Sequence, residues 1–151
     1  MRLLAVAALL ALTGCWSAPI PPDPIPVGER ILAWEDLDRP AAVGVEVGEA
    51  LVTDQTSWEG WVAGLPADLT QSRARDIEQV RVEGSVLVAA AWSSCESTSS
   101  LVERGPGRLD LVVERNRDCE ADTTTVEVWQ VELDELGVDR PDEVRLILED
   151  E

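Results

Sequence analysis

Few residue types in this chain could carry out chemistry. The 151-residue sequence contains no histidine, tyrosine or phenylalanine, so its reactive side chains are carboxylates, serines, threonines, arginines and three cysteines. Without histidine, neither a Ser-His-Asp triad, nor a Cys-His dyad, nor a histidine-ligated zinc site can be built. Catalysis would therefore have to rest on carboxylates, hydroxyls or thiols.

Carboxylates are so abundant that no catalytic pair stands out. Two of them suffice for glycoside hydrolysis, but among 30 Asp and Glu residues some pair lies close by chance. Calcium is the better hypothesis for a carboxylate site, because this ion takes clustered oxygen ligands. Two acidic loops are candidates: Glu35, Asp36 and Asp38, and then Asp134, Glu135, Asp139, Asp142 and Glu143. Neither has the spacing of an EF-hand loop, and a solvated acidic loop is the simpler interpretation, so we expect no enzyme, no bound metal and no cofactor.

Cys15 follows a short apolar segment near the start of the chain. Arg2 precedes an apolar run from Leu3 to Leu12, which is too short for the roughly 20 residues of a membrane-spanning helix. A basic residue, a short apolar run and small residues are typical of a secretory signal peptide. The ending Leu12-Thr13-Gly14-Cys15 resembles the lipobox of bacterial lipoproteins. The resemblance implies cleavage after residue 14 and lipid attachment to the Cys15 thiol; the alternative is an ordinary signal peptide cleaved elsewhere.

A lipid on Cys15 would determine the location and organisation of the protein. Two or more acyl chains hold a protein stably on a membrane, so the resemblance implies anchoring in the bacterial cell envelope. Trp16, in place of the aspartate that retains enterobacterial lipoproteins at the inner membrane, favours the outer membrane, on its periplasmic or surface face. Residues 1–14 are then a signal peptide and residues 15–27 a proline-rich linker, extended over roughly 35 Å. Residues 28–151 are expected to form a single domain.

Cys95 and Cys119 remain once Cys15 is lipidated. Outside the cytoplasm such a pair indicates a disulfide, which on the chain-entropy model would stabilise the fold by about 3 kcal/mol. A redox pair is the functional alternative, but it usually has a Cys-x-x-Cys spacing, which is absent here.

The charge of the chain restricts its partners. The formal net charge is −18, and every basic residue is an arginine. Such an acidic surface repels phosphate backbones and anionic headgroups, so we expect no nucleic-acid binding and no membrane attraction by charge. Attachment to a membrane would depend on the lipid.

Hydrophobic patterning predicts a mainly β domain: an antiparallel sheet or a β-sandwich with one or two short helices. The run from Val86 to Trp92 is apolar on both faces and is expected to be the central strand. Capping-box spacing between Thr56 and Glu59 indicates a helix over 57–65, and 68–80 could be a second helix or a loop. Strands are also expected over 29–37, 42–52, 101–102, 109–114, 124–133 and 144–148, with a hairpin turn at Gly105-Pro106-Gly107.

Six tryptophans supply all the aromatic side chains of the chain. In the helix predicted over 57–65, Trp58, Trp61, Val62 and Leu65 share one side, as a helix that buries one stripe requires. We expect the tryptophans to belong to the core, and a platform for a carbohydrate or a peptide is the alternative use.

A second resemblance concerns residues 51–149. The order of a tryptophan-bearing helix ("SWEGWVAGLP"), a buried strand ("VLVAAAW"), a hairpin ("RGPGRLDLVVE") and a later strand ("VEVWQVEL") is similar to small β domains related to the C-terminal domain of the protease-complex subunit PrcB. This resemblance implies a non-enzymatic partner of an envelope protease or of another envelope protein. The chain departs from the pattern at Gln79-Val80, where an aspartate-phenylalanine step would be expected.

Together these features predict a lipid-anchored envelope protein whose β domain binds another protein or has an accessory role. A calcium-dependent or carbohydrate-binding surface module is the alternative, and a carboxylate hydrolase is the least favoured. The identity of the partner cannot be deduced from these residues.

Replacing Cys15 with Ala tests the anchor. Without the thiol no lipid can be attached, so most of the protein should move from the membrane pellet to the soluble fraction on cell fractionation. A C15A protein that still sediments with membranes would contradict the lipid anchor.

Overall fold

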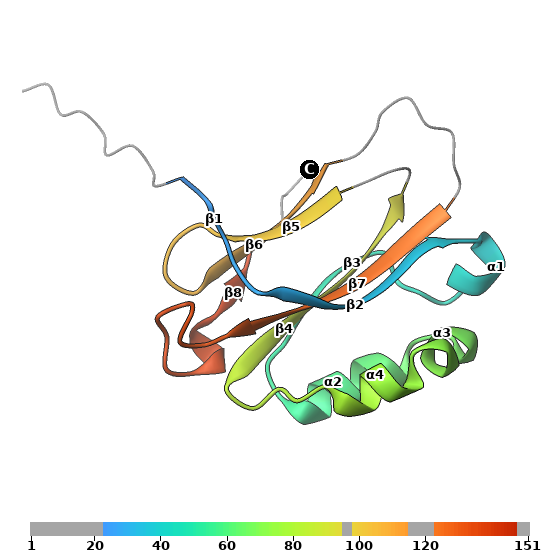
Figure 1. Cartoon of the computed structure of the whole chain (residues 1–151), viewed down its shortest axis with the longest axis horizontal. Helices are drawn as coiled ribbons and strands as arrows, with labels where there is room; N and C mark the ends of the chain where they lie inside the picture. The colour runs from blue at the N-terminus through green and yellow to red at the C-terminus, as the bar shows by residue number, and fades with distance from the viewer. Residues whose placement is uncertain (1–22, 95–97, 115–122, 148–151) are drawn as a thin grey trace, which may run out of the picture.

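The computed structural model describes residues 23–94, 98–114 and 123–147, which form three layers (Figure 1). Sheet A consists, in spatial order, of β1 (Ile25–Pro26), β5 (Thr98–Glu103), β6 (Arg108–Glu114) and β8 (Arg145–Leu146). Sheet B consists of β2 (Glu29–Leu37), β7 (Thr123–Glu132), β4 (Ser85–Ser94) and β3 (Gly48–Val52). All neighbouring strands are antiparallel except β6 and β8. The prediction of a mainly β, sandwich-like domain is confirmed.

Short helices form the third layer, on the face of sheet B that points away from sheet A (Figure 1). They are α2 (Gln55–Ala63), α3 (Ala67–Ser72) and α4 (Ala74–Gln79), while α1 (Arg39–Ala42) lies at the end of β2 and a 3-10 turn spans Pro141–Glu143. The region over 68–80, left open by its pattern, is therefore α3 and α4. None of the helices in the described ranges is long and apolar enough to cross a membrane.

Helix α2 begins at Gln55, because its N-cap is Asp54 rather than the predicted Thr56. The Asp54 carboxylate accepts hydrogen bonds from the backbone N–H and the hydroxyl of Ser57, each at 2.8 Å. These two bonds, the backbone bond first, lower the pKa of the Asp54 carboxyl below its usual range. The cap therefore stays ionised at neutral pH and fixes the start of the helix.

The strand β4 is buried on both faces, as the sequence predicts. Val86, Val88, Ala90 and Trp92 point into the core between the two sheets. Leu87, Ala89 and Ala91 point into a second core beneath the helices. Because side chains alternate along a strand, only a run that is apolar at every position can serve both cores.

The strand predicted over 42–52 is wrong in its first half, because pairing with β4 begins only at Gly48. Val43 and Val47, which a strand over 42–52 would place on one face, are 71% and 64% exposed. The physical reason is the backbone: Pro40 starts α1, and Gly44 and Gly48 have φ angles of +94° and +145°, which interrupt an extended strand. The strand predicted over 144–148 is likewise shorter than expected and is limited to β8.

The folded domain begins earlier than the predicted boundary at residue 28. Ile25 and Pro26 pair with β5, and Val27 is buried in the core between the sheets. At Gly28, with φ of +72°, the chain passes from sheet A to sheet B. A Cβ atom at Gly28 would lie 2.6 Å from the Gln130 carbonyl oxygen and 2.7 Å from Val131 Cγ2, so this crossing requires glycine.

We expect Gly28→Ala to lower the free energy of unfolding by about 3 kcal/mol, from backbone strain and from the clash with β7. Gly137→Ala is the matched control, since Gly137 has a φ of +63° with nothing within 4 Å of an added Cβ. The control should cost only about 1 kcal/mol of strain. Urea denaturation measures the free energy of unfolding of both variants. Equal losses would show that the close approach to Gln130 does not affect stability.

Candidate functional site

The three cysteines of the sequence analysis, Cys15, Cys95 and Cys119, lie outside the described residues, so lipid attachment and the disulfide stay predictions. The described neighbours of Cys95 and Cys119 are close in the fold. Ser94 pairs with Thr123, and Thr98 pairs with Glu114.

The acidic loops considered for calcium are used in other interactions. Glu143 accepts a hydrogen bond from the Asp139 N–H at 3.2 Å, and Arg140 lies 3.4 Å from carboxylate oxygens of both Asp142 and Glu143. Glu135 accepts a bond from the Gly28 N–H at 3.1 Å. Within residues 23–94, 98–114 and 123–147, no group of three or more acidic or cysteine side chains is arranged to hold a metal ion.

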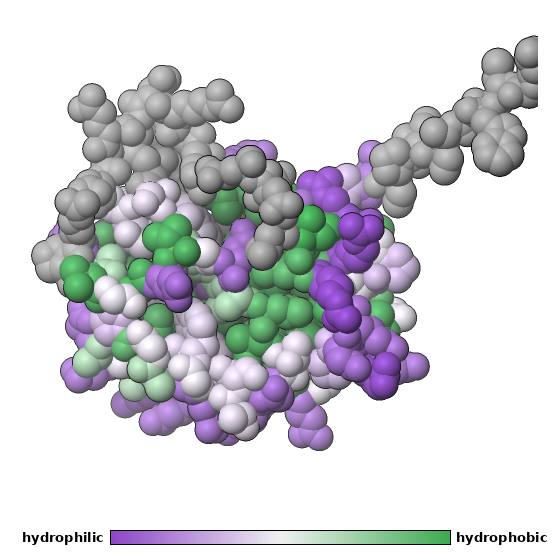
Figure 2. Space-filling view, turned by 180° about the vertical axis from the view of Figure 1, so that it is seen from behind, coloured by the Kyte–Doolittle hydropathy of each residue, from purple (hydrophilic) through white to green (hydrophobic). Residues whose placement is uncertain are grey.

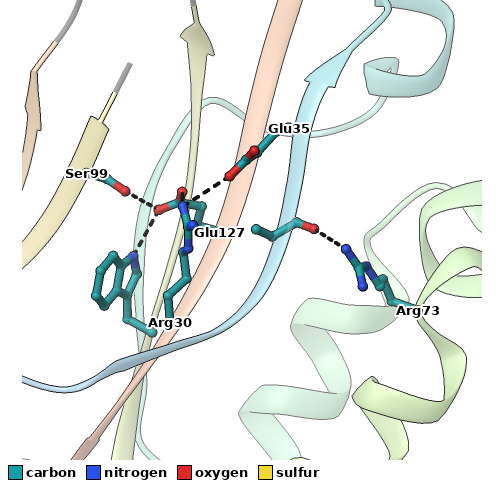
Figure 3. A network of polar contacts seen from close by, with 7 residues as sticks. Arg30, Glu35, Arg73, Ser99 and Glu127 are labelled. Atoms are coloured by element: carbon teal, nitrogen blue, oxygen red, sulfur yellow. Dashed lines mark hydrogen bonds and ion pairs between the residues drawn. The ribbon is translucent and has the colours of Figure 1, made fainter. Parts of the chain in front are cut away.

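A buried glutamate joins the two sheets (Figure 3). Glu127 of β7 is 2% exposed and points between the sheets. One of its carboxylate oxygens accepts from the Arg30 guanidinium. The other accepts from the Ser99 hydroxyl of β5 at 2.6 Å and from the Trp129 indole N–H at 3.0 Å. Arg30 also lies 3.2 Å from the exposed Glu35.

The space for the Glu127 carboxylate comes from small neighbours. Its cross-strand partners are Ala33 on β2 and Ala90 on β4, so the row across sheet B leaves room for a longer side chain. Both carboxylate oxygens have donors, as a buried charge requires. The Ser99 hydroxyl of β5 donates to Glu127 of β7, so this arrangement ties the two sheets together. In the sequence Glu127 gave no signal beyond being an acidic residue in a predicted strand.

We expect Glu127→Ala to lower the free energy of unfolding by about 3 kcal/mol, because a cavity opens and the donors on Ser99 and Trp129 lose their buried acceptor. Glu35→Ala is the matched control, since it removes the exposed carboxylate on the same arginine. It should change stability by less than about 1 kcal/mol. Chemical denaturation compares the two variants, and a similar small effect of both would mean that the sheets are held without this contact.

A groove lies at the edge of sheet B, between the C-terminal half of α2 and the loop that leads into β3. Its volume is about 520 Å³. The lining residues are Gly44, Val45, Glu46, Val47, Gly48, Glu49, Ala50, Gly60, Trp61, Gly64, Leu65, Ala89, Ala90 and Ala91. The groove therefore combines backbone at four glycines, apolar side chains and two carboxylates, and none of its lining residues in the described ranges is basic.

The tryptophans on α2 divide between core and groove. Trp58 is 2% exposed, which confirms its predicted place in the core. Trp61 stacks on it with ring centroids 5.4 Å apart, but Trp61 and Leu65 are only half buried and line the groove. The apolar stripe of this region therefore places Trp58 in the core and leaves Trp61 and Leu65 as an accessible apolar wall of the groove.

Exposed apolar side chains continue the groove outward. Val43 and Val47 are two of the three large hydrophobic residues that are exposed in the described part, the third being Ile25 on β1. β3 lies at the back of the view in Figure 1, and Figure 2 shows that side, where apolar surface is gathered between hydrophilic side chains. Large apolar side chains exposed in or beside a groove are typical of an interaction site.

A second groove, of about 710 Å³, lies between α2 and α4. Its charged lining residues are Glu59, Glu78, Glu83 and Arg81, and the Arg81 guanidinium donates to the carbonyl oxygens of Glu78 and Val80. No large hydrophobic side chain at its rim is exposed in the way that Val43 and Val47 are. The groove beside β3 is therefore the better candidate for recognition.

The chain matches no family model, no curated protein and no solved structure. The functional argument therefore rests on the geometry of this chain and on the signal at its N-terminus.

Proposed function

We propose that this chain is a lipid-anchored bacterial envelope protein whose β domain binds another envelope protein through the groove beside β3. The lipobox-like Leu12-Thr13-Gly14-Cys15 supports the anchor and the location. A partner carried on the same membrane, or reaching it, would meet the domain at the end of its proline-rich linker.

The observation that carries the binding role is the exposed apolar rim of this groove. Burying an exposed valine side chain contributes about 1.5 kcal/mol or more to an interface. Val47 lines the groove together with the half-buried Trp61, and the exposed Val43 directly precedes the lining residue Gly44 in the chain. Partly exposed tryptophans are enriched among the residues that dominate binding energies at protein interfaces. Among the described residues that line this groove, no nucleophile faces a base. Binding is therefore the role that its side chains support.

A photoreactive amino acid at position 43, in cells that naturally produce the protein, tests the proposal. We expect a discrete crosslinked partner of the envelope fraction with the reagent at Val43, because this side chain is exposed at the groove rim. The reagent at Ile25 is the control, since Ile25 is an exposed apolar residue at the edge of sheet A.

Val47→Asp should abolish the crosslink from position 43 by placing a charge at the apolar rim, while circular dichroism shows an unchanged fold. The same partner captured equally from positions 25 and 43, or a crosslink that persists in the V47D protein, would overturn the proposed binding site.

A further inference from the structure

We propose that the occupant of the groove is an extended, positively charged segment of a partner protein, which pairs with β3 as an additional strand of sheet B. This inference rests on the proposed function and specifies the chemistry of the partner. It follows from a comparison of the sheet edges, from the shape of the groove and from its charge.

Three of the four edge strands in the described ranges are poor templates for strand addition. β1 and β8 have two residues each, and β1 contains Pro26, which has no N–H to donate. β2 has register irregularities between Arg30 and Leu32 and between Trp34 and Leu37. Short strands, proline, irregular register and edge charges are the features by which proteins protect sheet edges from pairing with other chains.

Of these features, β3 has only a single edge charge. It pairs with β4 in unbroken register from Gly48 to Val52, and it contains one charged residue, Glu49, and no proline. No strand of the described part of the chain pairs with its other edge. A regular edge of this kind presents backbone N–H and C=O groups to an extended peptide, which is the basis of β-augmentation.

The groove fits an extended chain that lies along β3. A Cβ atom added at Gly44, Gly48 or Gly60 would meet nothing within 4 Å, so a second backbone can approach closely at these positions. The side chains of an added strand would alternate between the two faces of sheet B. On the helix side they would contact Trp61 and Leu65, which favours apolar residues at every second position of the partner.

Charge selects a partner over a second copy of this chain. Among the described residues that line the groove, Glu46 and Glu49 are the charged ones, and the whole chain carries a formal net charge of −18. Pairing β3 with β3 of another copy would bring two strongly acidic surfaces together, which like-charge repulsion opposes. A partner segment in which apolar and basic residues alternate matches both parts of the groove. Its apolar side chains suit the wall of Trp61 and Leu65, and its basic side chains suit the acidic rim.

The test uses a dye-labelled Arg-Val-Arg-Val-Arg-Val peptide and the full-length protein purified in detergent, with binding followed by fluorescence anisotropy at physiological salt. Two further peptides carry N-methyl groups on alternate amides, one on the arginines and the other on the valines. Only one set of amides of an added strand faces β3. We expect one methylated peptide to bind at least about tenfold more weakly and the other to bind like the parent, because lost backbone hydrogen bonds have this effect. Equal binding of all three peptides would overturn strand pairing, since their charge is identical.

The location of the binding site is tested by Glu46→Lys, with Glu59→Lys as the matched control. Glu59 is an exposed residue of α2 outside this groove, and both variants change the net charge equally. We expect E46K to weaken peptide binding several-fold and E59K to leave it nearly unchanged, because charges farther apart than about 8 Å are screened. An equal loss in both variants would show general attraction to an acidic protein and would overturn the inference.

The two proposals can fail separately. In the first case, position 43 captures its partner but neither methylated peptide loses affinity. The groove then binds a folded surface, which would overturn strand pairing and leave the proposed function supported. In the second case, the two methylated peptides differ in affinity but position 43 captures nothing in cells. The edge of β3 can then pair with a strand, and the proposed cellular role is overturned.

Discussion

The fold depends on one constraint, which is that β4 must be apolar at every position from Val86 to Trp92. Its alternate side chains form the middle of the core between the sheets and the middle of the core beneath the helices. Apolar burial is the main favourable term in folding, at about 25 cal/mol per Å² removed from water. The two faces of β4 and its neighbour β7 are therefore covered by different layers. Sheet A covers one face, and the helices α2 to α4 cover the other.

Polar contacts fix how these covers are placed over the two strands. On the sheet A side, Glu127 orients β5 over β7 through the Ser99 hydroxyl. On the helix side, the Trp34 indole N–H of β2 donates to the Leu69 carbonyl oxygen at 3.2 Å and to the Ser72 hydroxyl at 3.1 Å, which positions α3. Arg73 donates to the Ala33 carbonyl oxygen in the same region (Figure 3). Such directional bonds specify one arrangement among several that apolar burial alone would allow.

The sequence was sufficient to predict the elements that follow one dominant signal. The continuous apolar run over 86–92, the glycine turn of the β5–β6 hairpin and the helical spacing of Trp58 and Trp61 each had one physical explanation, and the structure confirms these elements. The boundaries that were wrong involve competing signals. Val43, Val45 and Val47 alternate like a strand, but Gly44 between them has a positive φ, and pairing with β4 begins only at Gly48.

The candidate site was harder to predict, because it depends on what the chain leaves uncovered. Trp61 and Leu65 were predicted to lie in the core, and only the placement of the loop before β3 shows that they form a wall accessible to solvent. The burial of Glu127 likewise depends on Ala33 and Ala90, which become its neighbours only through strand pairing. No local pattern contains either relation, since both arise from contacts between distant segments.

The way the chain enters the domain has a mechanical consequence. β1 is held to β5 by a short antiparallel pairing at Ile25 and Pro26, followed by the bond from the Val27 N–H to the Leu101 carbonyl oxygen. Tension on the N-terminal side would load these contacts one after another, as in unzipping, rather than shearing them together. The two-residue strand could detach up to the crossing at Gly28 and lengthen the chain outside the fold. Sheet B, with the groove beside β3, does not include β1 and would remain intact under such a pull, so the N-terminal strand can act as an extensible joint.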